Sequence, residues 1–170
     1  MQGNNRMPRE NPGVNQYPGR VSFLRRREIQ APLAACLIRE FAGSLGLEWA
    51  LEVAKAAIQA DAIMVGRSMA QRYGGYTMRD LARVVKEVWT EDEAITLRIL
   101  EESETRLRFD VTRCGYVELY ERLGMKEMGY CLSCSRDEAF ARGFNPRIKL
   151  ARTQTIMQGA PFCDFHFTLG

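Results

Sequence analysis

The chain has 170 residues, and its 46% hydrophobic content is sufficient for one domain with one core. The net charge is +3, but residues 1 to 27 contain six arginines and one glutamate, so the remainder is slightly acidic. This distribution argues against nucleic-acid binding, which requires a basic surface on the folded body. No apolar stretch approaches the roughly 20 residues that cross a bilayer, and residues 1 to 20 contain no apolar core of a secretion signal. We therefore expect a soluble, cytoplasmic protein with neither nucleic acid nor membrane as a partner.

Residues 1–20 are rich in Asn, Gly and Pro and show no periodicity, which predicts a disordered tail. A single domain is then expected over residues 21–170. Arg25, Arg26 and Arg27 are predicted to be the solvated start of its first helix, because runs of charge usually face solvent.

A large apolar residue recurs every four positions in the segment 28–45, which predicts an amphipathic helix whose large side chains face the core. These residues are Leu33, Leu37, Phe41 and Leu45. Cys36, flanked by apolar residues in the same segment, is expected to be a small buried side chain.

A long Ala-rich helix is predicted over 47–72, with Gly74 and Gly75 as its end, and its length leaves room for a homodimer. Thr77 and Asp80 have the spacing of a capping box, which predicts a third helix that finishes around Trp89.

The apolar period changes to two after Glu93, and the segments 95–99 and 107–112 are predicted to form a β-hairpin. A short helix over 115–123 follows, and two further strands are predicted over 148–157 and 162–169. Helices first and strands later indicate the α+β class, with N-terminal helices packed on a mostly antiparallel four-stranded sheet.

The five cysteines are an odd number in a protein that we expect to be cytosolic, so the sequence favours thiol or metal chemistry over disulfides. Cys134 precedes Ser135, which together with Glu138 has the pattern of a helix cap, and Gly143 is predicted to end that helix. A thiol at a helix N-terminus is favoured as the thiolate, which makes Cys134 a candidate nucleophile. Asp137, in the first turn, is either a general base or a residue that only complements the helix dipole.

Strand alternation places Cys163 and His166 on opposite faces, so the two are not expected to share a site. A zinc site is nevertheless an alternative, because Cys131 and Cys134, followed by Cys163 and His166, have the ligand count of a structural Cys3His site. That arrangement leaves Cys114 without a role.

Five segments, taken together, resemble the L-2-amino-thiazoline-4-carboxylic acid (ATC) hydrolase family. They are Arg113–Gly124, Cys134–Asp137, Gly143–Leu150, Arg152–Gly159 and Cys163–Phe167. The resemblance implies a hydrolase that opens an aminothiazoline carboxylate to N-carbamoyl-cysteine without a cofactor. It also implies a set of motif residues: Cys114, Cys134, Asp137, Asn145, Thr155, Gly159 and Cys163. Cys131 is an addition to the family pattern, and His166 stands where Arg is equally expected.

The implied chemistry is an attack on C2 of the aminothiazoline, an amidine-like carbon, by a thiolate or by activated water. Asp137 would hold the amidinium, and Arg113 or Arg152 would bind the substrate carboxylate. Asn145 and Thr155 would donate hydrogen bonds to developing charge, although Asn145 before proline is equally typical of a turn.

Two other functions fit the sequence. One is a non-catalytic small-molecule or metal-binding module with a Cys-rich zinc or iron site. The other is a different cysteine enzyme, such as a thiol-dependent transferase.

Overall fold

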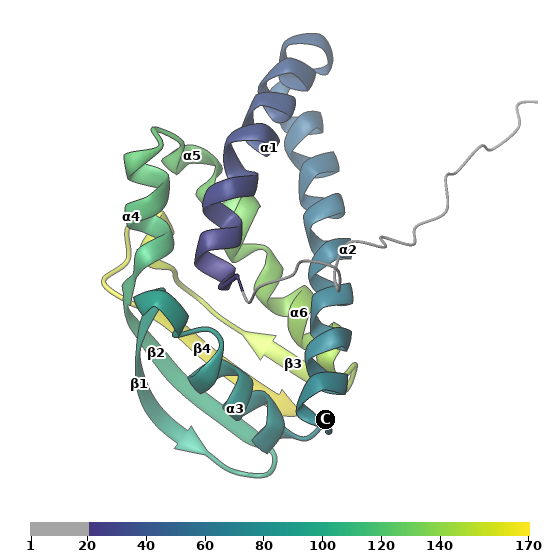
Figure 1. Cartoon of the computed structure of the whole chain (residues 1–170), viewed down its shortest axis with the longest axis vertical. Helices are drawn as coiled ribbons and strands as arrows, with labels where there is room; N and C mark the ends of the chain where they lie inside the picture. The colour runs from purple at the N-terminus through teal and green to yellow at the C-terminus, as the bar shows by residue number, and fades with distance from the viewer. Residues whose placement is uncertain (1–20) are drawn as a thin grey trace, which may run out of the picture.

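The computed structural model describes residues 21–170, and the predicted tail over residues 1–20 lies outside them. Two long helices begin the described chain, and a sheet with further helices follows (Figure 1). The helices are α1 Phe23–Leu45, α2 Leu47–Tyr73, α3 Met78–Glu87, α4 Gly115–Arg122, α5 Lys126–Gly129 and α6 Arg136–Phe144. Shorter helical turns are η2 Glu91–Glu93, η3 Tyr130–Cys134 and η4 Ile156–Gln158. The strands are β1 Ile95–Glu102, β2 Arg106–Cys114, β3 Ile148–Ala151 and β4 Cys163–Leu169.

The four strands form one sheet in the order β1-β2-β4-β3, and all neighbouring strands are antiparallel. α3 lies against the sheet, whereas the hairpin of α1 and α2 projects away from it (Figure 1). The predicted α+β class and the antiparallel four-stranded sheet are therefore confirmed. None of the helices built from residues 21–170 combines the length and apolarity needed to cross a membrane.

The strand predicted over 148–157 is too long, because β3 already ends at residue 151. The side chain of Asp164 on β4 causes this early end. Its carboxylate accepts hydrogen bonds from the backbone N–H of Thr153 at 3.0 Å and of Gln154 at 2.8 Å. These N–H groups are consequently not available to a strand ladder, and the chain leaves the sheet.

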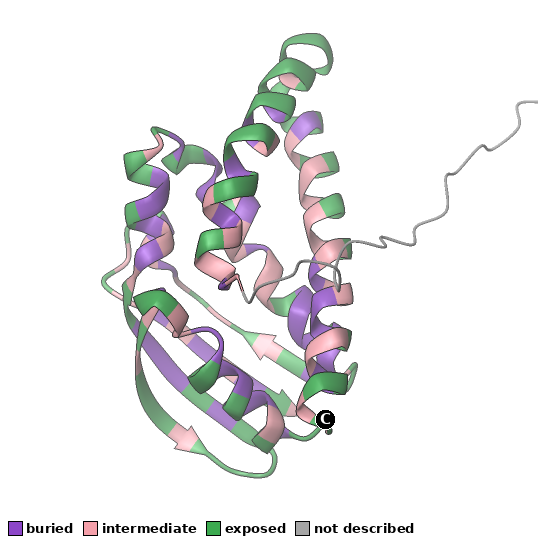
Figure 2. Cartoon of the chain, viewed as in Figure 1, coloured by how far each residue is buried: buried purple, intermediate pink, exposed green. Residues whose placement is uncertain are grey.

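The buried apolar face of α1 consists of two alanines and Ile38, and the large residues that recur at every fourth position are not part of it. Ala31 and Ala35 are buried, whereas Leu33 is 65% and Phe41 50% exposed. The prediction that this stripe of large residues faces the core is wrong, and so is the predicted burial of Cys36, which is exposed. Small side chains allow two helix axes to approach closely. Most of the tip of the α1–α2 hairpin is exposed (Figure 2).

The predicted capping box at the start of α3 is confirmed. The Thr77 hydroxyl accepts the backbone N–H of Asp80, and the Asp80 carboxylate accepts the backbone N–H of Thr77. α2 ends as predicted at Gly74, whose left-handed φ of 72° suits glycine. The cap fixes the direction in which α3 enters, and this places its apolar side over the sheet.

α6 crosses α2 at two glycines, Gly66 and Gly143. A Cβ atom at Gly66 would collide with the backbone of Phe140, and one at Gly143 would collide with the backbone of Ile63. The sequence predicts that Gly143 ends its helix, but α6 continues to residue 144. The glycine is instead needed because α2 and α6 approach each other closely at this position. This contact holds α6 at the depth where it forms one wall of the site described below.

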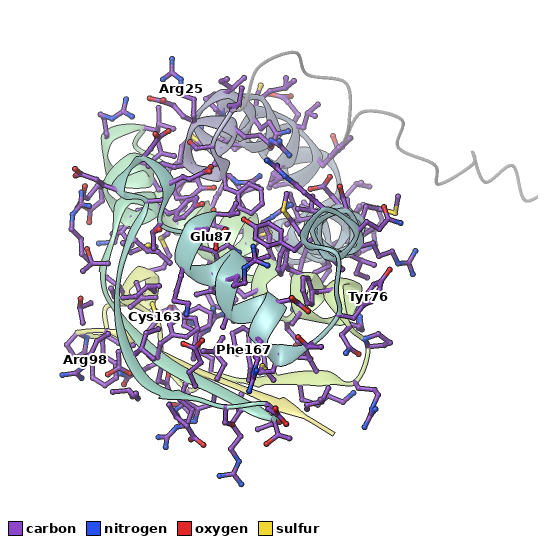
Figure 3. All side chains as sticks on the ribbon, turned by 60° about the horizontal axis from the view of Figure 1, so that its bottom comes forward. Arg25, Tyr76, Glu87, Arg98, Cys163 and Phe167 are labelled. Atoms are coloured by element: carbon purple, nitrogen blue, oxygen red, sulfur yellow. The ribbon has the colours of Figure 1, made fainter. Side chains whose placement is uncertain are left out.

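Aromatic rings fill the space between α3, α6 and the sheet. Phe109 and Phe165 stack with their centroids 4.9 Å apart, and Trp89 meets Phe140 edge to face at 5.5 Å. Figure 3 shows Cys163 and Phe167 turned toward this interior, while Arg98 lies at the periphery. The inner face of β4 therefore brings a thiol to the edge of the aromatic core.

Candidate functional site

A cavity of about 110 Å³ lies where the start of α1, the helical run from η3 to α6 and the inner face of the sheet meet. Aromatic and aliphatic side chains form most of its wall. Cys114, Cys134 and Cys163 add three thiols, and Asp137 adds a carboxylate. An apolar cavity of about 150 Å³ in another protein holds benzene, so this smaller space is on the scale of a single small ring.

The three thiols come from separate elements. Cys114 is the last residue of β2, Cys134 the last of η3, and Cys163 the first of β4. The Cys163 sulfur accepts the backbone N–H of Ile156 at 3.2 Å, which ties the loop after β3 to the start of β4. All three side chains line the same cavity.

Asp137 forms an ion pair with Arg152, and both side chains are largely buried. Arg152 also donates to the backbone carbonyl of Cys134 at 3.1 Å, and its guanidinium lies 5.1 Å from the centroid of the Phe165 ring. Burial raises the pKa of Asp137, although the attraction of Arg152 opposes this shift. The site therefore contains a carboxylate that is held in place and is more basic than an exposed one.

Burial raises the pKa of each of the three thiols, and that of Cys163 reaches about 11. Asp137 raises the pKa of Cys134 further, because two negative charges would lie close together. All three groups are therefore neutral thiols near pH 7 in the cavity.

The expected thiolate at Cys134 is wrong for a structural reason. The Ser135 hydroxyl does not cap α6 but donates to the Cys131 carbonyl at 2.6 Å, and the Ser135 N–H bonds the Tyr130 carbonyl at 2.9 Å. The backbone thus continues from η3 into α6 with helical angles at Ser135. Cys134 lies within a helical run and not at a free N-terminus, so the unpaired N–H groups that would stabilise a thiolate are missing.

Residues 26–167, which include every residue of this cavity except Phe23, match the family model described as L-2-amino-thiazoline-4-carboxylic acid hydrolase. The chain belongs to this ATC hydrolase family. No curated protein matches it in sequence. Among solved structures, it is similar to a trafficking protein particle complex subunit 3 from Naegleria fowleri, covalently bound to palmitic acid. The TM-score is 0.53, with 10% sequence identity over 85% of this chain and 95% of that one.

Four predicted site residues of this ATC hydrolase family member lie outside the cavity. The Arg113 guanidinium pairs with Glu118 at 2.6 Å, and the Asn145 amide donates to the Tyr76 carbonyl at 2.7 Å. Thr155 caps η4, and Gly159 ends it with a left-handed φ of 97°. Thr155 and Gly159 shape the loop in which the Ile156 N–H donates to the Cys163 sulfur. They therefore stabilise the loop beside the cavity and do not line the cavity itself.

The zinc ligand set considered above is not assembled. The Cys131 sulfur lies 3.9 Å from the Leu51 carbonyl on α2 and does not line the cavity. His166 faces the side of β4 opposite to Cys163, as strand alternation predicts. Across residues 21–170, no group of three or more His, Cys, Asp or Glu side chains is arranged to hold a metal ion.

Sequence reasoning missed the arginines of α1. Arg26 and Arg27 line the cavity, and Arg27 is only 8% exposed, so its predicted solvation is wrong. Arg27 lies one helical turn before Ala31 and two before Ala35, the two small residues that face the protein interior. That spacing was the signal in the sequence, but the adjacent run of three arginines obscured it.

Proposed function

We propose that this family member is a hydrolase that opens a small cyclic amidine, L-2-amino-thiazoline-4-carboxylate, to N-carbamoyl-cysteine. The observation that carries the proposal is the buried Asp137 carboxylate, which Arg152 holds beside three thiols in a cavity suited to a small ring. Family membership supports the reaction class, and the carboxylate and thiols that line the cavity support the assignment.

The reaction adds water to C2 of the ring and breaks the bond between C2 and the ring sulfur. C2 becomes the carbonyl carbon of the carbamoyl group, the sulfur leaves as a thiol with one proton, and the second proton of water ends on the ring nitrogen, which becomes an N–H of the product. Asp137 would accept the proton of the attacking water and return it to the departing sulfur. Its raised pKa makes it a stronger base than an exposed carboxylate, while the attraction of Arg152 favours the ionised form.

Water is favoured over a cysteine as the attacking group. The thiolate is the nucleophilic form of cysteine, and burial holds all three thiols in the neutral form. In this account the thiols form a polarisable wall around the ring sulfur, and Asp137 performs the proton transfers.

The direct test is to incubate the purified full chain with L-2-amino-thiazoline-4-carboxylate and to identify the product by chromatography and mass spectrometry. N-carbamoyl-cysteine should accumulate with many turnovers per protein, and a chelator should leave the rate unchanged. Recovery of unchanged substrate from folded protein would contradict the proposal.

The second candidate is a module that binds a small apolar ligand without turnover. The apolar walls and the neutral thiols favour it, and the structurally similar subunit 3 is described as covalently bound to palmitic acid. The cavity here is too small for a long acyl chain, so this candidate predicts a compact ligand. Tight binding of a ring compound that is recovered unchanged would support this candidate over hydrolysis.

A further inference from the structure

Arg27 is a buried cation that lacks a full set of partners. It lies in the second turn of α1, lines the cavity and is 8% exposed. One terminal nitrogen donates to the Gln30 amide oxygen at 3.3 Å, but its Nε has no hydrogen-bond partner among the described residues. A buried N–H group without a partner is rare in folded proteins, which suggests that the Nε of Arg27 has a function.

Two neighbouring arginines of the cavity differ from Arg27 because each has a carboxylate. Arg136 pairs with Asp61 on α2, and Arg152 pairs with Asp137. Arg27 forms no ion pair with a carboxylate within residues 21–170, and the nearby charge of Arg136 adds repulsion that exceeds the attraction of Asp61. The cavity therefore carries an excess of positive charge on the side of α1.

A buried guanidinium without a counter-ion is costly, because it has lost its hydration and gained no compensating charge. Burial and the repulsion of Arg136 accordingly lower the pKa of Arg27. An anion in the cavity would supply the missing charge and an acceptor for the Nε. A planar carboxylate matches the fork of a guanidinium with two parallel hydrogen bonds.

Tyr116 adds a second donor for such an anion. It lines the same cavity and is close enough to Arg27 for the two to interact electrostatically. Burial raises the pKa of Tyr116, so its hydroxyl stays protonated and able to donate. Asp137, in contrast, is the only carboxylate that the described residues place in the cavity wall, and it suits a cationic group.

We infer that Arg27 binds the carboxylate of a small ring compound in this cavity, while Asp137 faces the cationic end of the same ligand. The ligand class is a five-membered heterocycle that carries a carboxylate. The inference rests on the proposed function and deepens it, because it names the residue that recognises the acid group. Arg113 and Arg152, the sequence-based candidates for this role, are respectively outside the cavity and paired with Asp137.

The test uses thiazole-4-carboxylate and thiazole-4-carboxamide, which have nearly the same shape and differ in charge. Neither is opened by water under assay conditions, so binding is measured without turnover. Calorimetry on the full chain should show the acid binding about tenfold or more tightly than the amide, as expected for a charge-assisted hydrogen bond. Arg27→Gln should reduce this preference to about threefold or less.

Arg25→Gln is the matched control, because Arg25 belongs to the same helix but is exposed and paired with Glu28. This variant should keep the wild-type preference for the acid. Equal binding of acid and amide to the wild type, or an unchanged preference in a folded Arg27→Gln protein, would overturn the inference. If Arg27→Gln does not fold, the Nε–H resonance of Arg27 in the wild type provides the test. The acid should shift it and the amide should not, and an unmoved resonance in the acid-bound protein would overturn the inference.

Failure of this inference and failure of the proposed hydrolysis give different results. Selective binding of the acid without conversion of the aminothiazoline would support the role of Arg27 and contradict the hydrolase. Turnover that is unaffected by Arg27→Gln, in both kcat and KM, would overturn the role of Arg27 and leave the hydrolase intact.

Discussion

Asp137 and Arg152 form a largely buried ion pair, and the same arginine donates to the backbone carbonyl of Cys134. This pair links α6 to the loop after β3 and fixes a carboxylate beside a thiol at the wall of the cavity. Removing one partner would leave the other charge buried and unpaired, at a cost of about 3 to 5 kcal/mol. The site therefore depends on this contact for its shape as well as for its chemistry.

The first prediction concerns the attacking group. Cys134→Ser and Cys163→Ser should each retain turnover within about tenfold of the wild type, because water attacks and the neutral thiols only line the cavity. Initial rates of product formation test this, with circular dichroism to confirm folding. A complete loss of turnover in folded Cys134→Ser, together with normal ligand binding, would identify Cys134 as the nucleophile.

The second prediction concerns stability at alkaline pH. The folded pKa of Cys163 is about 11, against an ordinary value of 9.0, so the folded state retains a proton that the unfolded chain loses. The contribution of this group to the free energy of unfolding is complete below pH 9.0 and is lost as the pH rises to about 11. It amounts to about 2 to 3 kcal/mol, because each tenfold difference in proton affinity between the two states corresponds to about 1.4 kcal/mol.

Urea unfolding at a series of pH values in this range measures the effect. The free energy of unfolding should fall less steeply with pH in Cys163→Ser than in the wild type. Parallel pH profiles for the two proteins would show that burial does not shift the pKa of this thiol.

The third prediction concerns the order in which the cysteines are alkylated. Cys36 is exposed on the outer face of α1, whereas Cys134 and Cys163 are partly or fully buried with raised pKa values. Iodoacetamide at neutral pH should therefore modify Cys36 first. Peptide mapping by mass spectrometry at increasing times gives the order. Faster modification of Cys134 than of Cys36 would indicate a stabilised thiolate in the cavity.

The fourth prediction compares two glycines in helices. Gly143→Ala should destabilise the protein by about 1 to 3 kcal/mol, because the new methyl group collides with the backbone of α2. Gly43→Ala, in α1 with no atom near the new methyl group, should instead stabilise it by about 0.5 to 1 kcal/mol. Thermal unfolding of both variants shows whether each change lowers or raises the stability. Equal stability changes would show that α2 and α6 do not cross this closely.

Much of the site could be predicted from the sequence because local rules place its residues. Strand alternation turns Cys163 inward and His166 outward, and the position of Cys114 at a strand end brings it to the same edge. Asp137 lies close to Cys134 in sequence, so one helical run carries both.

The remaining features depend on how distant segments pack. The periodic pattern of α1 did not reveal which of its faces is buried, because small side chains such as Ala35 form the contact and large ones such as Leu33 lie outside. The burial of Arg27 follows from that packing. The early end of β3 depends on hydrogen bonds to the Asp164 side chain, and the hydrophobic periodicity of the sequence does not reveal such bonds.

The measurement that tests the central claim most directly is the rate of N-carbamoyl-cysteine formation in Asp137→Asn, with Glu138→Gln as the control. Glu138 is the next residue of α6 and is exposed, so its change leaves the cavity unaltered. Asp137→Asn should lower kcat by about 100-fold or more, as expected for loss of a general base, while Glu138→Gln keeps the wild-type rate. Wild-type turnover in a folded Asp137→Asn protein would contradict the account.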